Sequence, residues 1–264
     1  MNSARVRRWV KSLLPRKITD QYVLLKRGAQ AFRDVRGRYP RDCPICGYQG
    51  HFWAKGRQPM VFDGECPRCG SVGRHRQHEL LVGRHPDWID GAQVLHFAPE
   101  ACFDQRYRQR INATGGRYVR AAYAPRKGEM QVDMQAIPFP AHSFDTVIHH
   151  NVLEHVVDDH KALAEIARVL KPGGRTIFTV PLVDAWAHTY EDPSIVTKAK
   201  RDLHFNKDDH LRLYGRDFLD RLTRAGLDHE IYVAEEPEVS RYGLERGETI
   251  FVATPHDPVR LEPV

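Results

Sequence analysis

Residues 137–180 read IPFPAHSFDTVIHHNVLEHVVDDHKALAEIARVLKPGGRTIFTV and predict a strand, a helix and a second strand, in that order. Residues 146–149 and 176–180 are short apolar runs, which is typical of buried strands. The helix between them has its apolar residues at core spacing: Ala162, Leu163, Ile166, Val169 and Leu170. It is expected to stop at residues 171–174, KPGG, because proline prevents continuation and glycine supplies the turn. The pattern indicates a βαβ unit.

The same alternation of strands and helices continues on both sides of this unit. Residues 94–97 and 118–121 are expected to form the two preceding strands. A later helix is expected at about 216–225, with Gly226 just past its end, and a final strand at 248–254, antiparallel at or near a sheet edge. The sequence therefore predicts an α/β fold with a doubly wound sheet.

Ahead of this α/β region lie two matched cysteine knuckles, CPICG at 43–47 and CPRCG at 66–70. Four thiolates at this spacing can close a tetrahedral site, so Cys43, Cys46, Cys66 and Cys69 are predicted to hold a structural Zn²⁺ in a zinc ribbon. Two disulfides, or a redox Cys-x-x-Cys, are the alternatives. The fifth cysteine, Cys102, is expected to be a reduced thiol.

Charge is distributed unevenly along the 264 residues, whose net charge is +6. Residues 1–40 carry eleven Lys and Arg against two Asp, or +9, which leaves −3 for the rest of the chain. Apolar residues recur at near-helical spacing at 6–14, so this basic arm could bind RNA or an anionic membrane surface. A helix packed on the body, with its basic face in solvent, is the alternative.

Three regions follow from these features: a basic arm at 1–40, a zinc ribbon at 41–80 and an α/β domain at 81–264, with residues 71–81 forming a helix that leads into the last region. No apolar run approaches the roughly 20 residues that span a bilayer. The N-terminus also lacks the apolar stretch of a secretory signal. These properties predict a soluble, cytoplasmic protein.

Three sequence blocks in the α/β region resemble a known enzyme class. PF…SFD ends at Asp145, LEHV occupies 153–156 and RVLKPGG occupies 168–174. In this order and at these distances, they resemble the class I S-adenosylmethionine-dependent methyltransferases, specifically the type 11 group. The resemblance covers about residues 90–254. Together with the ribbon, the chain looks like bacterial methyltransferases that carry a CPxCG…CPxCGSxxRHR head and an LHFAPE first strand.

The resemblance implies a Rossmann-like, seven-stranded methyltransferase sheet with S-adenosylmethionine across the carboxyl ends of its first strands. By position, the implied cofactor contacts are His96, Ala98, Pro99, Glu100, Ala122, Asp133, Met134, Asn151 and Val152. Asp133 and Met134 match the residues that receive the adenine. Ala98 and Glu100 stand where the class has glycines, and Glu100 could offer its carboxylate to the cofactor's amino group or ribose. Ala122 stands where the class has a ribose-binding acid.

The resemblance is less informative about the acceptor. His210 and His155 are the predicted catalytic residues, ahead of His150 and His188. His210 belongs to a DHxRxYG block in the insert where lids of this fold are built. A structural role is the alternative for both. Some small-RNA methyltransferases hold a divalent ion in a Glu-x-x-Glu-His cluster with a further His; Asn151 replaces the first Glu here, so only Glu154 and His155 match.

The sequence thus predicts an S-adenosylmethionine-dependent methyltransferase that O-methylates a small-molecule, sugar or glycan-type acceptor. An RNA-modifying methyltransferase that grips phosphates with the ribbon and basic arm is one alternative. A non-catalytic binding scaffold is the other, because Ala98, Glu100 and Ala122 depart from the usual cofactor-binding pattern.

Overall fold

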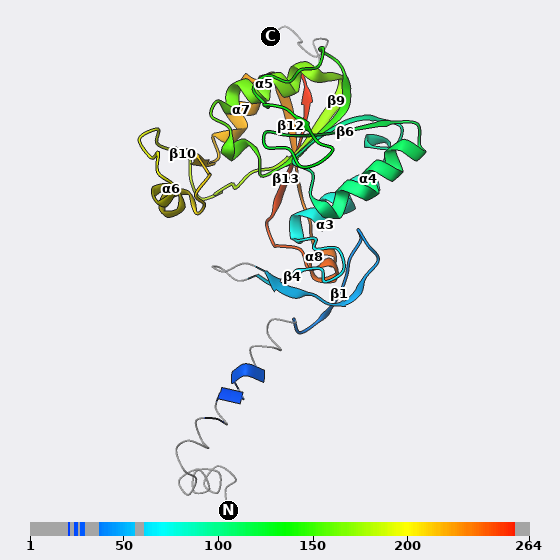
Figure 1. The fold of residues 1–264 in the computed structure, drawn as a ribbon, viewed down its shortest axis with the longest axis vertical. Helices are drawn as coiled ribbons and strands as arrows, with labels where there is room; N and C mark the ends of the chain where they lie inside the picture. The colour runs from blue at the N-terminus through cyan, green and yellow to red at the C-terminus, as the bar shows by residue number, and fades with distance from the viewer. Residues whose placement is uncertain (1–20, 22–23, 26, 30–36, 56–60, 257–264) are drawn as a thin grey trace, which may run out of the picture.

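The computed structural model describes residues 21, 24–25, 27–29, 37–55 and 61–256 (Figure 1). The predicted basic arm therefore lies almost entirely outside the described residues, and so does its apolar pattern at 6–14. None of the helices within the described ranges is long and apolar enough to cross a membrane.

Seven strands form one central sheet, in the order β12-β13-β9-β8-β5-β6-β7. Their bounds are β5 Gln93–Phe97, β6 Arg117–Ala122, β7 Met130–Gln131, β8 Phe144–His150, β9 Leu170–Thr179, β12 Leu227–Val233 and β13 Thr249–Pro255. Pairs from β9 to β7 are parallel, whereas β13 runs antiparallel to both of its neighbours. The seven-stranded sheet is as predicted, and the antiparallel final strand lies second from one edge.

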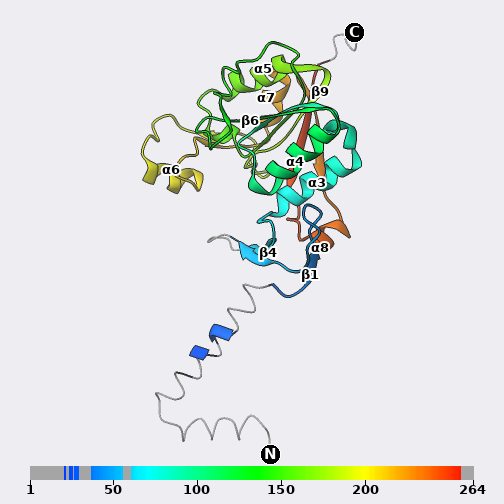
Figure 2. The ribbon, with the colours of Figure 1, turned by 45° about the vertical axis from the view of Figure 1, so that its right-hand side comes forward.

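Helices cover both faces of the sheet, which makes it doubly wound. α5 (Asp159–Val169) and α7 (Phe218–Arg224) share a core with one face. α3 (Gly73–Arg84) and α4 (Ala101–Ala113) pack on the other, side by side in both views (Figures 1 and 2). Because side chains alternate along a strand, each central strand supplies apolar residues to both cores.

The β8–α5–β9 unit has the order that the sequence predicts. The side chain of Asp158 accepts a hydrogen bond from the backbone N–H of Lys161 at 2.9 Å, which caps the start of α5. The helix ends at Val169, and Leu170 is already extended and paired with Phe144 of β8. Residues 171–174 therefore belong to β9 and do not form the helix stop itself. Leu170 is fully buried, so the core holds it in the strand.

Residues 180–217 form an insert between β9 and α7, which we call the lid. It contains β10 (Tyr190–Glu191), α6 (Lys198–Phe205) and β11 (Arg212–Leu213). Buried Arg212 fastens the lid to the segment after β8, because its guanidinium donates hydrogen bonds to the carbonyls of Leu153, Val156 and Val157. This contact places the lid against the short helix η2 (Leu153–His155).

The ribbon precedes α3 and consists of two small antiparallel hairpins. β1 (Pro40–Asp42) pairs with β2 (Gln49–His51), and β3 (Trp53–Lys55) pairs with β4 (Val61–Glu65). It lies against α3 and the C-terminal helix α8 (Glu238–Tyr242), as Figure 1 shows. α3 runs across the boundary between the predicted second and third regions at residue 80, so it is shared by both.

Arg76 of α3 joins these parts and is fully buried. Its guanidinium donates to the carbonyls of Gly64 and Ser71 in the ribbon, and to those of Tyr242 and Gly243 at the end of α8. It also lies 4.6 Å from the centre of the Phe52 ring, a cation–π contact. Planar and always charged, a guanidinium can serve several carbonyls at once.

Candidate cofactor pocket

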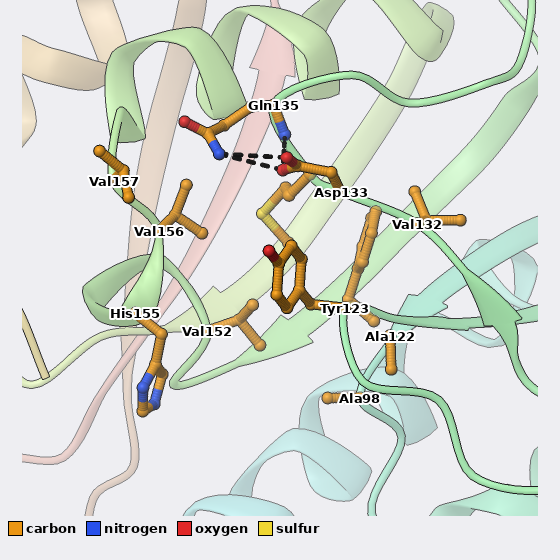
Figure 3. Close-up of a pocket in the computed structure, with 12 residues that line it drawn as sticks. Ala98, Ala122, Tyr123, Val132, Asp133, Gln135, Val152, His155, Val156 and Val157 are labelled. Carbon is orange, nitrogen blue, oxygen red and sulfur yellow. Dashed lines mark hydrogen bonds between the residues drawn. The ribbon is translucent and has the colours of Figure 1, made fainter. Parts of the chain in front are cut away.

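A cavity of about 280 Å³ opens at the carboxyl ends of β5, β6 and β8 (Figure 3). This is the edge of a parallel sheet where open α/β folds bind ligands. Most of its wall is apolar. The lining residues are Phe97, Ala98, Ala122, Tyr123, Val132, Asp133, Met134, Gln135, Val152, His155, Val156 and Val157.

Asp133 supplies the charged group of this wall. Its Oδ1 accepts hydrogen bonds from the backbone N–H of Gln135 at 2.9 Å and from Gln135 Nε2 at 3.1 Å, which fixes the carboxylate (Figure 3). Met134 is buried beside it, and Val152 comes from the segment after β8. A flat aromatic ring could lie against these apolar side chains while an amino group donates to Asp133, so the wall fits an adenine.

The turn after β5 keeps the backbone shape of a glycine loop without the glycine. Ala98 has a φ of +48° and donates its backbone N–H to the carbonyl of Ala121 at 2.7 Å. That conformation costs an L-residue roughly 1–2 kcal/mol. Pro99 follows, outside the lining, and its carbonyl accepts a hydrogen bond from Arg126.

At the end of β6 the wall has no acidic side chain. Ala122 lines the cavity, and Tyr123, the next residue, lines it with a side chain that is 76% exposed. Tyr123 carries a hydroxyl that can both donate and accept hydrogen bonds. The sequence analysis missed this residue, although its place directly after the second strand was a usable signal. The ribose partner that Ala122 cannot supply has a candidate here.

His96 and Glu100 do not line the cavity. Instead they belong to what we call the histidine cluster: Glu100 with His75, His78, His96 and His150. Glu100 Oε1 lies 3.2 Å from His75 Nε2, and Glu100 Oε2 lies 3.6 Å from His96 Nε2. The rings of His78 and His150 are 4.8 Å apart, edge to face. The cluster fills the space between α3, α4 and the sheet.

Burial keeps these imidazoles neutral. His78 is fully buried, and neither of its ring nitrogens has a hydrogen-bond partner within the described residues. Burial lowers the pKa of His78 to about 3, and the neighbouring His96 adds to the effect. Folding therefore prevents His78 from taking a proton at any pH near neutrality.

Replacing His78 by leucine is expected to reduce the acid sensitivity of the protein. Between about pH 7.5 and about pH 5, His78 in the wild type binds a proton only when unfolded, where its pKa is about 6.5, so the stability it permits near neutrality falls by about 2 kcal/mol. Glu154, whose pKa burial raises to about 7, acts in the opposite direction in both proteins. Urea unfolding of variant and wild type at both pH values isolates the histidine.

The matched control is His160→Leu, because His160 is exposed on α5. That variant should show the pH dependence of the wild type. If His78→Leu also lost as much stability as the wild type on acidification, His78 would not be held neutral by burial.

The two predicted catalytic histidines lie together at the edge of the cavity. His155 lines it, whereas His210 reaches the same place from the lid. Their ring centres are 4.8 Å apart, and His210 Nε2 is 3.8 Å from Glu154 Oε1. Asn151, which does not line the cavity, has a φ of +51° and accepts a hydrogen bond from Thr179 at 2.7 Å, which shapes the turn before η2.

In the ribbon, the two cysteine knuckles have the same geometry. Gly47 donates its backbone N–H to the carbonyl of Cys43, and Gly70 does the same to Cys66, both at 2.9 Å. Both glycines have a φ of +70°, a conformation that a side chain would strain. Each knuckle thus turns its two sulfurs toward those of the other.

The four sulfurs fit a tetrahedral metal site. All lie within 4.8 Å of one another, and the Sγ atoms of Cys43 and Cys69, and those of Cys46 and Cys66, are 3.6 Å apart. Zn–S bonds of about 2.3 Å at tetrahedral angles place sulfurs about 3.8 Å apart. Disulfide sulfurs lie about 2.05 Å apart, and all four cysteines are free thiols, as is Cys102. The arrangement is compatible with a zinc ribbon.

Comparison with known proteins places the central segment of the chain. Residues 92–178 match the family model described as a methyltransferase domain. Among curated proteins, the chain is 42% identical over 64 residues to the ubiquinone/menaquinone biosynthesis C-methyltransferase UbiE of Pasteurella multocida, covering 23% of this chain and 24% of that protein. The chain spans about a quarter of the length of such relatives.

Solved structures with a similar fold include two methyltransferases. The 1,6-didemethyltoxoflavin-N1-methyltransferase of Burkholderia thailandensis, solved with S-adenosylhomocysteine, is 15% identical with a TM-score of 0.46, over 67% of this chain and 76% of that one. An S-adenosylmethionine-dependent methyltransferase from Mesorhizobium loti is 15% identical with a TM-score of 0.45, over 67% and 96%. Residues 92–178, from the strand that opens the cavity to the strand beyond it, thus match the methyltransferase domain family, within a Rossmann-like, doubly wound, seven-stranded sheet.

Proposed function

We propose that this protein is an S-adenosylmethionine-dependent methyltransferase that methylates an oxygen of a small-molecule, sugar or glycan-type acceptor. The observation that carries the proposal is the cavity at the carboxyl ends of β5, β6 and β8, which lies within the segment that matches the methyltransferase domain. It combines an apolar wall with one fixed carboxylate, that of Asp133.

Each end of the cofactor has residues suited to it. Asp133 would accept from the adenine amino group, and Met134 and Val152 would contact the ring. The hydroxyl of Tyr123 would bind the ribose in place of the missing acid. When bound, the cofactor supplies a sulfonium-activated methyl group. The chain itself must then orient the acceptor and exclude water, which can account for much of the rate of such a transfer.

The acceptor side favours an oxygen atom. His155 lies on the cavity wall, with His210 and Glu154 behind it. Burial raises the pKa of Glu154 to about 7, so this group changes protonation near neutral pH, which suits chemistry on a hydroxyl. The UbiE relatives are named as C-methyltransferases, so the methylated atom must be identified in the product.

Calorimetric titration with S-adenosylhomocysteine is expected to show binding by the zinc-replete protein, and Asp133→Ala should weaken it about tenfold to a hundredfold. The reason is that a hydrogen bond to a charged acceptor contributes about 1.5–3 kcal/mol. Asp220→Ala, an exposed site on α7, is the matched control and should bind like the wild type.

The same titration separates the alternatives. A folded wild-type protein that gave no heat with either S-adenosylmethionine or its demethylated product would contradict the methyltransferase proposal and favour a scaffold. An RNA-modifying enzyme would instead bind RNA with a steep salt dependence that disappears when residues 1–40 are removed.

A further inference from the structure

We infer that Glu154, His155 and His210 form a binding site for a divalent transition-metal cation at the edge of the cavity. One ligand atom from each residue lies within 4.8 Å of the other two. Two imidazoles and one carboxylate are a donor set that such cations prefer, and the set leaves coordination positions open. The metal site stands on the geometry below, while its catalytic use rests on the proposed function.

Glu154 provides the first reason. Its side chain is fully buried, and neither carboxylate oxygen has a hydrogen-bond partner within the described part of the chain. A buried carboxylate without a partner is costly, and such groups are normally paired or coordinate a metal. No Lys or Arg side chain pairs with it in that part of the chain, and its nearest charged-type neighbour is His210 Nε2, at 3.8 Å. A cation would complete this environment.

The two histidines provide the second reason, because each presents a free ring nitrogen. His155 Nδ1 lies 3.2 Å from the carbonyl oxygen of Asp209, so it can donate there and leave the lone pair on Nε2. Metal-binding histidines usually make such a bond with their other nitrogen. His210 Nε2 faces Glu154, and its Nδ1 is buried without a partner within the described ranges. Both rings are thus oriented as ligands.

The third reason is how the residues are brought together. Glu154 and His155 lie on η2, after β8, whereas His210 comes from the lid. The backbone N–H of Leu211 donates to the carbonyl of Glu154 at 2.9 Å, and Arg212 holds the same segment. Two independent contacts therefore fix the lid ligand beside the η2 ligands, and few adjustments are needed to bring the donors to bonding distance of about 2.0–2.2 Å.

Because His155 lines the cavity, the open coordination positions would face the acceptor. A bound cation would hold the acceptor hydroxyl and lower its pKa, so that its proton leaves to solvent. The oxygen would then form the new bond to the methyl carbon as the carbon–sulfur bond breaks, with the electron pair remaining on sulfur.

The test is titration of Mn²⁺ into the zinc-replete full-length protein, with free Mn²⁺ followed by electron paramagnetic resonance. Mn²⁺ favours oxygen and nitrogen ligands over thiolates, so the cysteine site does not compete. The wild type is expected to bind one Mn²⁺ per chain. Glu154→Gln and His210→Ala should each weaken binding by at least about tenfold. His160→Ala, an exposed histidine on α5, should bind like the wild type.

Glu154→Gln preserves shape and removes a buried charge, so it is expected to fold; zinc content and the unfolding midpoint check this. Failure of the wild type to bind Mn²⁺, or equal binding by folded Glu154→Gln, would overturn the metal site. Titration with S-adenosylhomocysteine in the absence of Mn²⁺ tests the methyltransferase proposal separately, so either idea can fail alone.

Discussion

Cys66→Ser is expected to abolish zinc binding and to lower the free energy of unfolding by about 5 kcal/mol or more. Structural zinc contributes about 10–16 kcal/mol of apparent binding free energy in zinc-finger peptides, a contribution that exists only when the site is formed. Cys66 is fully buried, and its sulfur lies 3.6 Å from that of Cys46, so the serine oxygen would meet a site built for four sulfurs. Metal analysis and urea unfolding measure the two effects.

Cys102→Ser is the matched control for this change. Cys102 is also a free cysteine, but it lies outside the four-sulfur cluster, near His75. It should retain the zinc of the wild type and unfold at a similar urea concentration. A purified wild type without zinc, or a Cys66→Ser protein as stable as Cys102→Ser, would exclude a structural role for metal in the ribbon.

Arg76→Lys is expected to lower the free energy of unfolding by about 3–5 kcal/mol although the charge is kept. The guanidinium serves four carbonyls from two ends of the chain, those of Gly64, Ser71, Tyr242 and Gly243. A lysine ammonium is a single point with three donors, so at least one buried carbonyl would lose its partner at about 1–3 kcal/mol. Lysine also loses the flat contact with Phe52.

Arg74→Lys, two residues earlier on the same helix, is the comparison. Arg74 makes none of these bonds to the ribbon and α8, so urea unfolding should differ little from the wild type. Similar unfolding midpoints for the two variants would show that the carbonyls around Arg76 are satisfied without the guanidinium fork.

The central part of the fold could be predicted because its apolar periodicity is strong. The strands at β5, β6, β8 and β9 and the helix α5 follow short apolar runs or a helical apolar face. β12 has no such pattern: it is an edge strand whose residues are mostly half-buried or exposed, and its sequence, LDHEIYV, is largely polar at the start. Sheet pairing with β13, not local sequence, makes it a strand.

The site was predictable to a similar degree. Ala98, Ala122, Asp133, Met134, Val152 and His155 do line the cavity, and their cofactor roles stay predictions. His96 faces the other way because it alternates with Phe97 along β5, which strand periodicity alone implies. The neighbours of Glu100 could not be inferred, since His75 and His150 reach it from distant parts of the chain.

The contacts between the ribbon and α8 also set an order of events during synthesis. Arg41 bonds to the carbonyl of Ser240, and Arg241 pairs with Asp42 at 2.8 Å, so residues 199 positions apart must meet. The ribbon leaves the ribosome early, whereas α8 is among the last elements to emerge. The knuckles can close on a metal long before their docking surface exists. The nascent chain therefore carries a formed but unanchored ribbon until almost the whole sequence has been translated.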